Sequence, residues 1–278
     1  MTTIQATVEV QDLRKSFFDE SRGEVRAVDG VSFSCRPGEV FGLLGANGAG
    51  KTTTLRVLST VLRPTGGTAS VMGHDVLAQP EAVRKNLGFY SASTALYPRL
   101  TGRETLEFFA RINSYPPERV AGRVEALIDR FGIREYAGAR VEKLSTGMKQ
   151  KVSIARTIAH DPPVLIFDEP TVGLDVLNAL EMAKMIRELG GEGKTILYSS
   201  HIMSEVEKLC DRIGIIHRGQ LLALGTLESL REATGQHYLE DIFIHYVTRT
   251  EGSEGVGIGA MGELQEASPA GERPRGAR

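Results

Sequence analysis

The sequence has few cysteines, no long apolar run and almost no net charge, and each absence excludes a class of protein. Of the two cysteines, Cys35 ends a strand-like run and Cys210 follows Leu209, and both are expected to be small buried side chains rather than a disulfide or a metal pair. No stretch approaches the roughly 18 charge-free apolar residues of a membrane span. The N-terminus has no signal-peptide layout. A net charge of -2 gives no electrostatic footprint for nucleic acid. We therefore expect a soluble, cytoplasmic chain that binds no nucleic acid.

A phosphate-binding loop is the strongest functional signal in the sequence. Residues 45–52 read Gly-Ala-Asn-Gly-Ala-Gly-Lys-Thr, which fits the pattern of a glycine, four free positions and then Gly-Lys-Thr. Glycines permit the turns and the close backbone approach that let consecutive N–H groups wrap a polyphosphate. An apolar strand at 40–44 precedes the loop, and Leu55, Leu58 and Leu62 have the spacing of one helical face after it.

This strand, loop and helix together predict a nucleotide site. Lys51 can reach the β- and γ-phosphates, the hydroxyl of Thr52 can bind Mg²⁺, and the positive end of the helix faces the anion. The expected ATP-binding residues of this segment are Gly45, Asn47, Gly48, Ala49, Gly50, Lys51, Thr52 and Thr53.

The rest of the chain predicts an α/β fold around this loop. Residues 6–44 alternate strand-like runs with polar turns and predict an antiparallel sheet. Helical periodicity over 96–158 predicts an inserted helical subdomain at about 93–158. Strands and helices then alternate, which predicts a parallel sheet and makes the core a P-loop NTPase fold with a mixed sheet. We place the ATP-binding domain at 1–249 and a disordered tail at 250–278.

Two carboxylates follow a buried strand downstream of the loop. The charge-free run at 164–167 ends in Asp168 and Glu169. A P-loop sheet needs a second Mg²⁺ contact at such a position, and a neighbouring carboxylate can orient or deprotonate the attacking water. We assign Asp168 to the metal and Glu169 to the water.

With these elements in order, residues 6–247 resemble the ATP-binding subunits of ABC transporters. Leu144-Ser145-Thr146-Gly147-Met148-Lys149-Gln150 is similar to the family's signature motif, which more often reads Leu-Ser-Gly-Gly-Gln. The resemblance implies that Ser145 and Gly147 contact the γ-phosphate held by an opposite subunit. A serine hydroxyl and a glycine N–H at a helix start form an anion site, which agrees with that role.

Further matches follow in the family's order. Asp175, in Gly-Leu-Asp, resembles the loop that touches the other subunit, and His201 resembles the switch histidine that contacts the γ-phosphate. Phe17 stands where the family places an aromatic that stacks on adenine, with Phe18 as the alternative. Ala92 stands where the family usually has a glutamine that bridges magnesium, water and the transport subunit.

The resemblance implies an ATPase that works with a membrane partner. Two copies would bind Mg-ATP head to tail and drive a separate permease at the cytoplasmic face of the membrane, through a surface around 97–107. Segments such as Leu-Glu-Asp-Ile-Phe at 239–243 resemble those of the sodium-exporter subunits, the NatA group, and this resemblance favours export. Two alternatives stay open: a regulatory nucleotide-binding module with weak hydrolysis, because Ala92 replaces glutamine, and a DNA-maintenance ATPase of the same superfamily.

Overall fold

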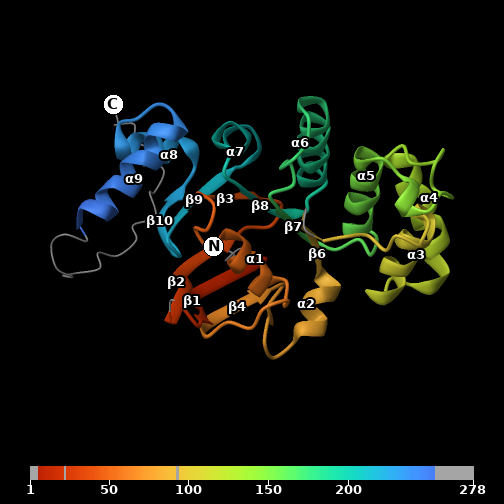
Figure 1. Cartoon of the computed structure of the whole chain (residues 1–278), viewed down its shortest axis with the longest axis horizontal. Helices are drawn as coiled ribbons and strands as arrows, with labels where there is room; N and C mark the ends of the chain where they lie inside the picture. The colour runs from red at the N-terminus through yellow and green to blue at the C-terminus, as the bar shows by residue number, and fades with distance from the viewer. Residues whose placement is uncertain (1–5, 22, 92–93, 254–278) are drawn as a thin grey trace, which may run out of the picture.

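The structure is a computed structural model that describes residues 6–21, 23–91 and 94–253. Its centre is a six-stranded sheet in the order β10-β9-β3-β8-β7-β6 (Figure 1). The strands are β3 (Val40–Leu44), β6 (Leu87–Ser91), β7 (Val164–Asp168), β8 (Thr195–Ser200), β9 (Arg212–His217) and β10 (Gln220–Gly225). All neighbouring pairs are parallel except β9 and β10, so the predicted mixed sheet is confirmed.

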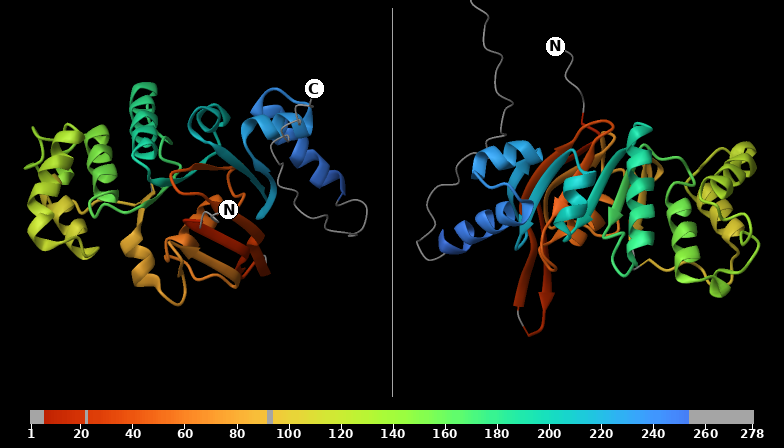
Figure 2. Two further views of the ribbon diagram at one scale, coloured as in Figure 1. Left: turned by 180° about the vertical axis from the view of Figure 1, so that it is seen from behind. Right: turned by 90° about the horizontal axis from the view of Figure 1, so that it is seen from above.

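A second, antiparallel sheet has the order β2-β1-β4-β5. Its strands are β1 (Val8–Asp19), β2 (Gly23–Cys35), β4 (Gly66–Val71) and β5 (His74–Asp75). The β1–β2 ribbon extends beyond the central sheet (Figure 2, right). This is the antiparallel subdomain that the alternating runs before the phosphate loop predicted, and β3, the phosphate-loop strand that follows it, belongs to the central sheet.

Helices cover the central sheet, and two further groups of helices lie at its two ends. Helices α3 to α5 gather at one end and α8 and α9 at the other (Figures 1 and 2). The helices are α1 (Lys51–Leu58), α2 (Pro80–Asn86), α3 (Gly102–Ile112), α4 (Val120–Arg130), α5 (Thr146–Thr157), α6 (Val176–Gly191), α7 (Met203–Leu209), α8 (Leu227–Thr234) and α9 (Leu239–Ser253). Short 3₁₀ turns at Pro117–Arg119 and Val141–Lys143 complete the inserted helical lobe.

The lobe is joined to the sheet by apolar packing and by its own local signals. Thr101 caps α3 and exchanges hydrogen bonds with Glu104 in a capping box, so the helix begins where its sequence places a threonine three residues before a glutamate. Val124, Leu127 and Ile128 on α4 are fully buried in the same cluster as strand residues of the central sheet. Burial of such side chains stabilises the fold by about 1.5–3 kcal/mol each.

Two boundaries differ from the sequence predictions. Helix α1 ends at Leu58, so Leu62 lies beyond the helix, although it packs against the same core. The tail was expected to be disordered from residue 250, yet α9 extends to Ser253, so that prediction is wrong for residues 250–253. Tyr246 packs against the core and holds this helix in place, which the polar composition after Val247 does not reveal. Residues 254–278 lie outside the described part of the chain.

No helix in the described ranges is both long enough and apolar enough to span a bilayer.

Candidate active site

The phosphate loop joins the end of β3 to the start of α1, as its pattern predicts. Gly50 immediately precedes α1 with φ of 109°, and Gly48 has φ of 80°, both in the region that favours glycine. A Cβ at Gly50 would lie 2.5 Å from the carbonyl oxygen of Ala27 on β2. The loop therefore requires glycine at this position for both conformation and space.

The loop encloses a cavity of about 270 Å³ in front of the N-terminus of α1. The backbone N–H groups and the positive end of the helix make this position favourable for a phosphate. The cavity is lined by Ala27, Asn47, Gly48, Ala49, Gly50, Lys51, Thr52, Thr53 and Glu169. Seven of the eight loop residues expected to bind ATP thus line one cavity, and Gly45 contributes through its carbonyl.

Lys51 is buried, and its ammonium group is held by three oxygen atoms. Its Nζ donates to the carbonyl oxygens of Gly45 at 2.6 Å and Ala46 at 3.1 Å. It also lies 3.0 Å from Oε1 of Glu169. A cation kept at the cavity by carbonyls on one side can exchange its carboxylate partner for a phosphate.

Asp168 ends β7 beside the loop and has a carboxylate fixed by two hydroxyls. Thr52 Oγ1 donates to its Oδ1 at 3.0 Å, and Ser199 Oγ donates to the same atom at 2.8 Å. Burial raises the pKa of Asp168, an effect that these two hydrogen bonds partly offset. The carboxylate and the Thr52 hydroxyl are hard oxygen donors of the kind that Mg²⁺ prefers, so the residues present fit this ion.

Glu169 and His201 face each other at the carboxyl ends of neighbouring strands. Nδ1 of His201 lies 3.3 Å from Oε2 of Glu169. Glu169 has φ of 48°, and its N–H donates to Ser199 Oγ at 3.1 Å, which turns the carboxylate toward the cavity. Strained backbone of this kind recurs at functional sites, because the surrounding structure must hold it.

The structure places Phe17 on β1, at the edge of this region. It pairs with Val25, two residues before Ala27 in the cavity wall. Its ring is 42% exposed, and Nζ of Lys15 lies 4.9 Å from the ring centroid. Phe18 is far more exposed. Phe17 is thus an available aromatic face near the cavity, as the resemblance implies for adenine stacking.

The signature residues lie on a separate surface in the helical lobe. Ser145 caps α5 and accepts a hydrogen bond from the Met148 N–H at 3.3 Å. Asp175 caps α6 in the same way: its Oδ1 accepts a hydrogen bond from the Asn178 N–H at 3.0 Å. A Cβ at Gly147 would lie 3.6 Å from the side chain of Asn178, so the two predicted contact motifs are neighbours.

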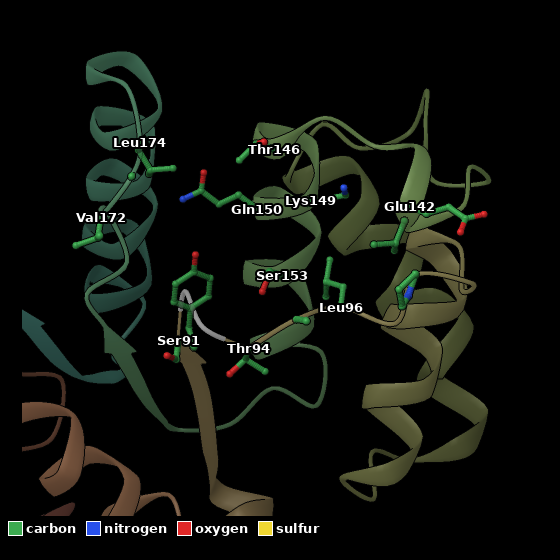
Figure 3. Close-up of a pocket in the computed structure, with 15 residues that line it drawn as sticks. Ser91, Thr94, Leu96, Glu142, Thr146, Lys149, Gln150, Ser153, Val172 and Leu174 are labelled. Carbon is green, nitrogen blue, oxygen red and sulfur yellow. The ribbon is translucent and has the colours of Figure 1, made fainter.

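A second cavity, of about 510 Å³, lies between the end of β6, α5 and the segment that precedes α6 (Figure 3). Ser91 at the end of β6, Gln150 on α5 and Leu174 beside α6 are among the residues that line it. Ala92, the departure from the family's usual glutamine, lies outside the described residues, as does Ser93.

Sequence reasoning missed three contributors to the site. Ser199 fixes both Asp168 and the backbone of Glu169, and its position at the end of a buried strand was an available signal. Gln150 Nε2 donates to the carbonyl oxygen of Pro170 at 3.3 Å, which links α5 to the loop after β7. Ala27 forms part of the cavity wall, and nothing in its local sequence indicates this.

Comparisons with known proteins agree with this geometry. The family described as ABC transporter matches residues 28–172, more than half of the chain. The ABC transporter ATP-binding protein NatA of Bacillus subtilis is 43% identical over 84% of this chain and 95% of that protein. The daunorubicin resistance ATP-binding protein DrrA3 of Streptomyces coeruleorubidus is 38% identical over 77% of this chain and 67% of that protein.

Solved structures show the same fold. One, the ATP-binding subunit of an ABC transporter, superposes with a TM-score of 0.78 at 30% identity, over 87% of this chain and 99% of that one. Another, the ATP-binding cassette MJ0796 in a dimeric post-hydrolysis state bound to ADP and Pi, has a TM-score of 0.71 at 22% identity, over 79% of this chain and 98% of that one. The family match, the relatives and the assembled site lead to one conclusion: the chain belongs to the ABC transporter family and is an ATP-binding subunit with ATPase activity.

Proposed function

We propose that two copies of this chain bind Mg-ATP between them, and that hydrolysis at Glu169 drives export through a separate membrane permease. The observation that carries this proposal is the grouping of four side chains at the phosphate loop: Lys51, Thr52 and Glu169 line its cavity, and Asp168 accepts a hydrogen bond from Thr52.

Thr52 and Asp168 would hold the magnesium ion, because their oxygen atoms already lie 3.0 Å apart at the mouth of the loop. When bound, the ion would neutralise developing charge on the β- and γ-phosphate oxygens. Lys51 would release Glu169 and pair with the phosphates, while the loop N–H groups wrap the β-phosphate.

Glu169 would accept a proton from the water that attacks the γ-phosphorus. The bond between that phosphorus and the oxygen bridging the β- and γ-phosphates breaks, which yields ADP and inorganic phosphate. His201, 3.3 Å from Glu169, is placed to orient the γ-phosphate against this pair. The ring of Phe17 would stack on the adenine.

The second copy is needed because, in the arrangement that the family implies, the signature segment does not reach the phosphate loop of its own chain. Ser145 and Asp175 each cap a helix, α5 and α6 respectively, both are exposed, and neither lines the phosphate cavity. A head-to-tail partner would place its Ser145 and Gly147 against the γ-phosphate of this copy, and its Asp175 beside the shared site. Each site would then contain groups from both chains, so ATP would close the pair and hydrolysis would release it.

Export rather than import is supported by the relatives. The daunorubicin resistance protein DrrA3, the linearmycin resistance protein LnrL and a Nod factor export protein share 35–39% identity with this chain. The permease would hold the chain at the cytoplasmic face of the membrane. Its contact surface would lie around 97–107, where the rings of Tyr97, Phe108 and Phe109 pack together.

Single-turnover hydrolysis of ATP by the purified chain tests the enzymatic part of the proposal. The wild-type chain should convert bound ATP to ADP, and Glu169→Gln should stop the conversion while ATP still binds. Glu192→Gln, a change of the same chemistry at a residue that pairs with Arg130 and lines neither cavity, serves as the matched control. Hydrolysis that persists in Glu169→Gln would contradict the role of this residue. No hydrolysis by the wild type, with the permease present, would favour the regulatory module.

Detergent pull-down of the intact complex tests the partner surface. Changes at Tyr97 and Arg99, such as Tyr97→Ala with Arg99→Glu, should reduce co-purification of the permease. Undiminished association would move the contact surface elsewhere.

A further inference from the structure

A carboxylate that the sequence analysis passed over lies behind the loops that carry Glu169 and His201. Glu205 belongs to α7, which packs against β3 and β8 (Figure 1). Its Oε2 accepts three hydrogen bonds from hydroxyls, Tyr198 at 2.6 Å, Thr171 at 2.9 Å and Ser200 at 3.1 Å. All three donors are buried.

Each donor lies next to part of the hydrolytic site. Ser200 directly precedes His201, and its Oγ accepts the N–H of Ile202 at 3.0 Å, so the turn that carries the histidine closes around this hydroxyl. Thr171 lies two residues after Glu169 on the loop that leaves β7. One oxygen atom of Glu205 therefore ties together the two loops whose side chains meet at 3.3 Å.

Tyr198 makes this arrangement rigid. Its ring is fully buried in the central sheet, and its hydroxyl donates to Glu205 at 2.6 Å. Burial, with a further contribution from the hydrogen bond and the charge of Glu205, raises the pKa of Tyr198, so the phenol stays protonated and remains a donor. Buried hydrogen-bond networks of this kind fix a single arrangement of the groups around them.

We propose that Glu205 is a positioning residue for ATP hydrolysis, which holds the His201 turn and the Glu169 loop in register through Ser200 and Thr171. The inference rests on the proposed roles of Glu169 and His201. Glu205 lines a groove between α6 and α7 that shares no lining residue with the phosphate cavity. Its loss should therefore lower the rate of hydrolysis and leave nucleotide affinity intact, because a small misplacement of reacting groups slows a reaction by up to about a hundredfold.

The test measures kcat and KM for Mg-ATP and the Kd for a fluorescent ADP with the purified full chain. We expect Glu205→Gln to lower kcat about tenfold to a hundredfold and to change the Kd for ADP less than twofold. Tyr198→Phe removes one donor and should lower kcat by a smaller factor. Glu207→Gln is the matched control on the same helix, because Glu207 contacts Arg231 and the N–H of Leu239 instead; it should leave kcat unchanged.

A double variant separates positioning from a general structural effect. In the His201→Ala background, Glu205→Gln should lower kcat much less than it does in the wild-type background, because both changes affect the same unit. A loss of kcat by the same factor in both backgrounds, an unchanged kcat in Glu205→Gln, or a parallel loss of ADP affinity would each overturn the proposal.

Two further variants keep the test decisive. If Glu205→Gln does not yield folded protein, Thr171→Val and Ser200→Ala each remove one hydroxyl donor and leave the carboxylate in place, and the same kcat loss at constant Kd is expected. Hydrolysis that persists in Glu169→Gln would refute the proposed function itself. Loss in Glu169→Gln together with normal hydrolysis in Glu205→Gln would refute only the inference about Glu205.

Discussion

We predict that Glu169 competes with a phosphate for Lys51 and thereby lowers the affinity for nucleotide. Nζ of Lys51 is 3.0 Å from Oε1 of Glu169, and both residues line the phosphate cavity. A phosphate that enters the cavity must replace the carboxylate at the ammonium group. Glu169→Gln removes the competing charge and leaves the shape of the side chain almost unchanged, so it should tighten the binding of ADP.

The geometry bounds the size of this effect. At 3.0 Å and an effective dielectric constant of about 20, two unit charges attract with about 5.5 kcal/mol, which is an upper bound. Glu169 is 22% exposed, and Lys51 keeps its bonds to Gly45 and Ala46, so solvent and carbonyls offset much of this energy. A net hydrogen bond to a charged group contributes about 1.5–3 kcal/mol. Because glutamine still accepts a bond from Lys51, we expect the lower end, about tenfold in Kd.

The assay is calorimetric titration of ADP in magnesium-free buffer. ADP is the product of the reaction, so hydrolysis does not change the measured affinity. Without magnesium, no metal contact adds to the affinity, and the effect of the contact with Lys51 is measured by itself. Glu192→Gln is the matched control, since Glu192, directly after α6, pairs at 2.8 Å with Arg130 at the end of α4. Equal or weaker binding of ADP by Glu169→Gln, with Glu192→Gln at the wild-type value, would refute the competition.

Three further predictions concern backbone, buried charge and pH. Gly50→Ala should abolish ADP binding and destabilise the fold by about 2 kcal/mol or more, because the new Cβ meets the Ala27 carbonyl oxygen at 2.5 Å; titration and urea unfolding measure both. Arg212→Ala should lower the free energy of unfolding in urea by about 3–5 kcal/mol. In the wild type the Arg212 guanidinium lies 3.2 Å from the buried carboxylate of Glu39, which would lose this cationic partner. Burial lowers the pKa of His160 to about 4, so its neutral form is favoured in the fold and stability falls as pH drops from 6.5 toward 4. Between pH 7 and pH 5 the free energy of unfolding should fall by about 2 kcal/mol more in the wild type than in His160→Leu.

Each of these three has an outcome that contradicts it. Wild-type ADP affinity in Gly50→Ala would show that the loop tolerates a side chain. Equal costs for Arg212→Ala and for Arg212→Ala with Glu39→Ala would show that the remaining charge is not the cause. Parallel pH curves for the wild type and His160→Leu would assign the acid sensitivity to other groups.

The fold class followed from local patterns wherever those patterns had a single interpretation. The charge-free run at 164–167 predicted a strand buried on both faces with Asp168 at its carboxyl end, and β7 confirms this. The end of α9 could not be predicted in this way, because Tyr246 holds the helix through a contact with a distant part of the core. The role of Phe17 in adenine stacking stays a prediction, because the contact of its ring in the structure is with Lys15.

The sequence by itself determined the loop that binds phosphate, the strands before it and the two acids, because glycine patterns and apolar runs act over a few neighbouring residues. Only the tertiary structure decided which groups meet. Thr52 and Asp168 are 116 positions apart, and the order β3-β8-β7 brings them within 3.0 Å. The same strand order lets one carboxylate on α7 tie Thr171 to Ser200. Strand order depends on how distant faces pack together, and local composition does not record that choice.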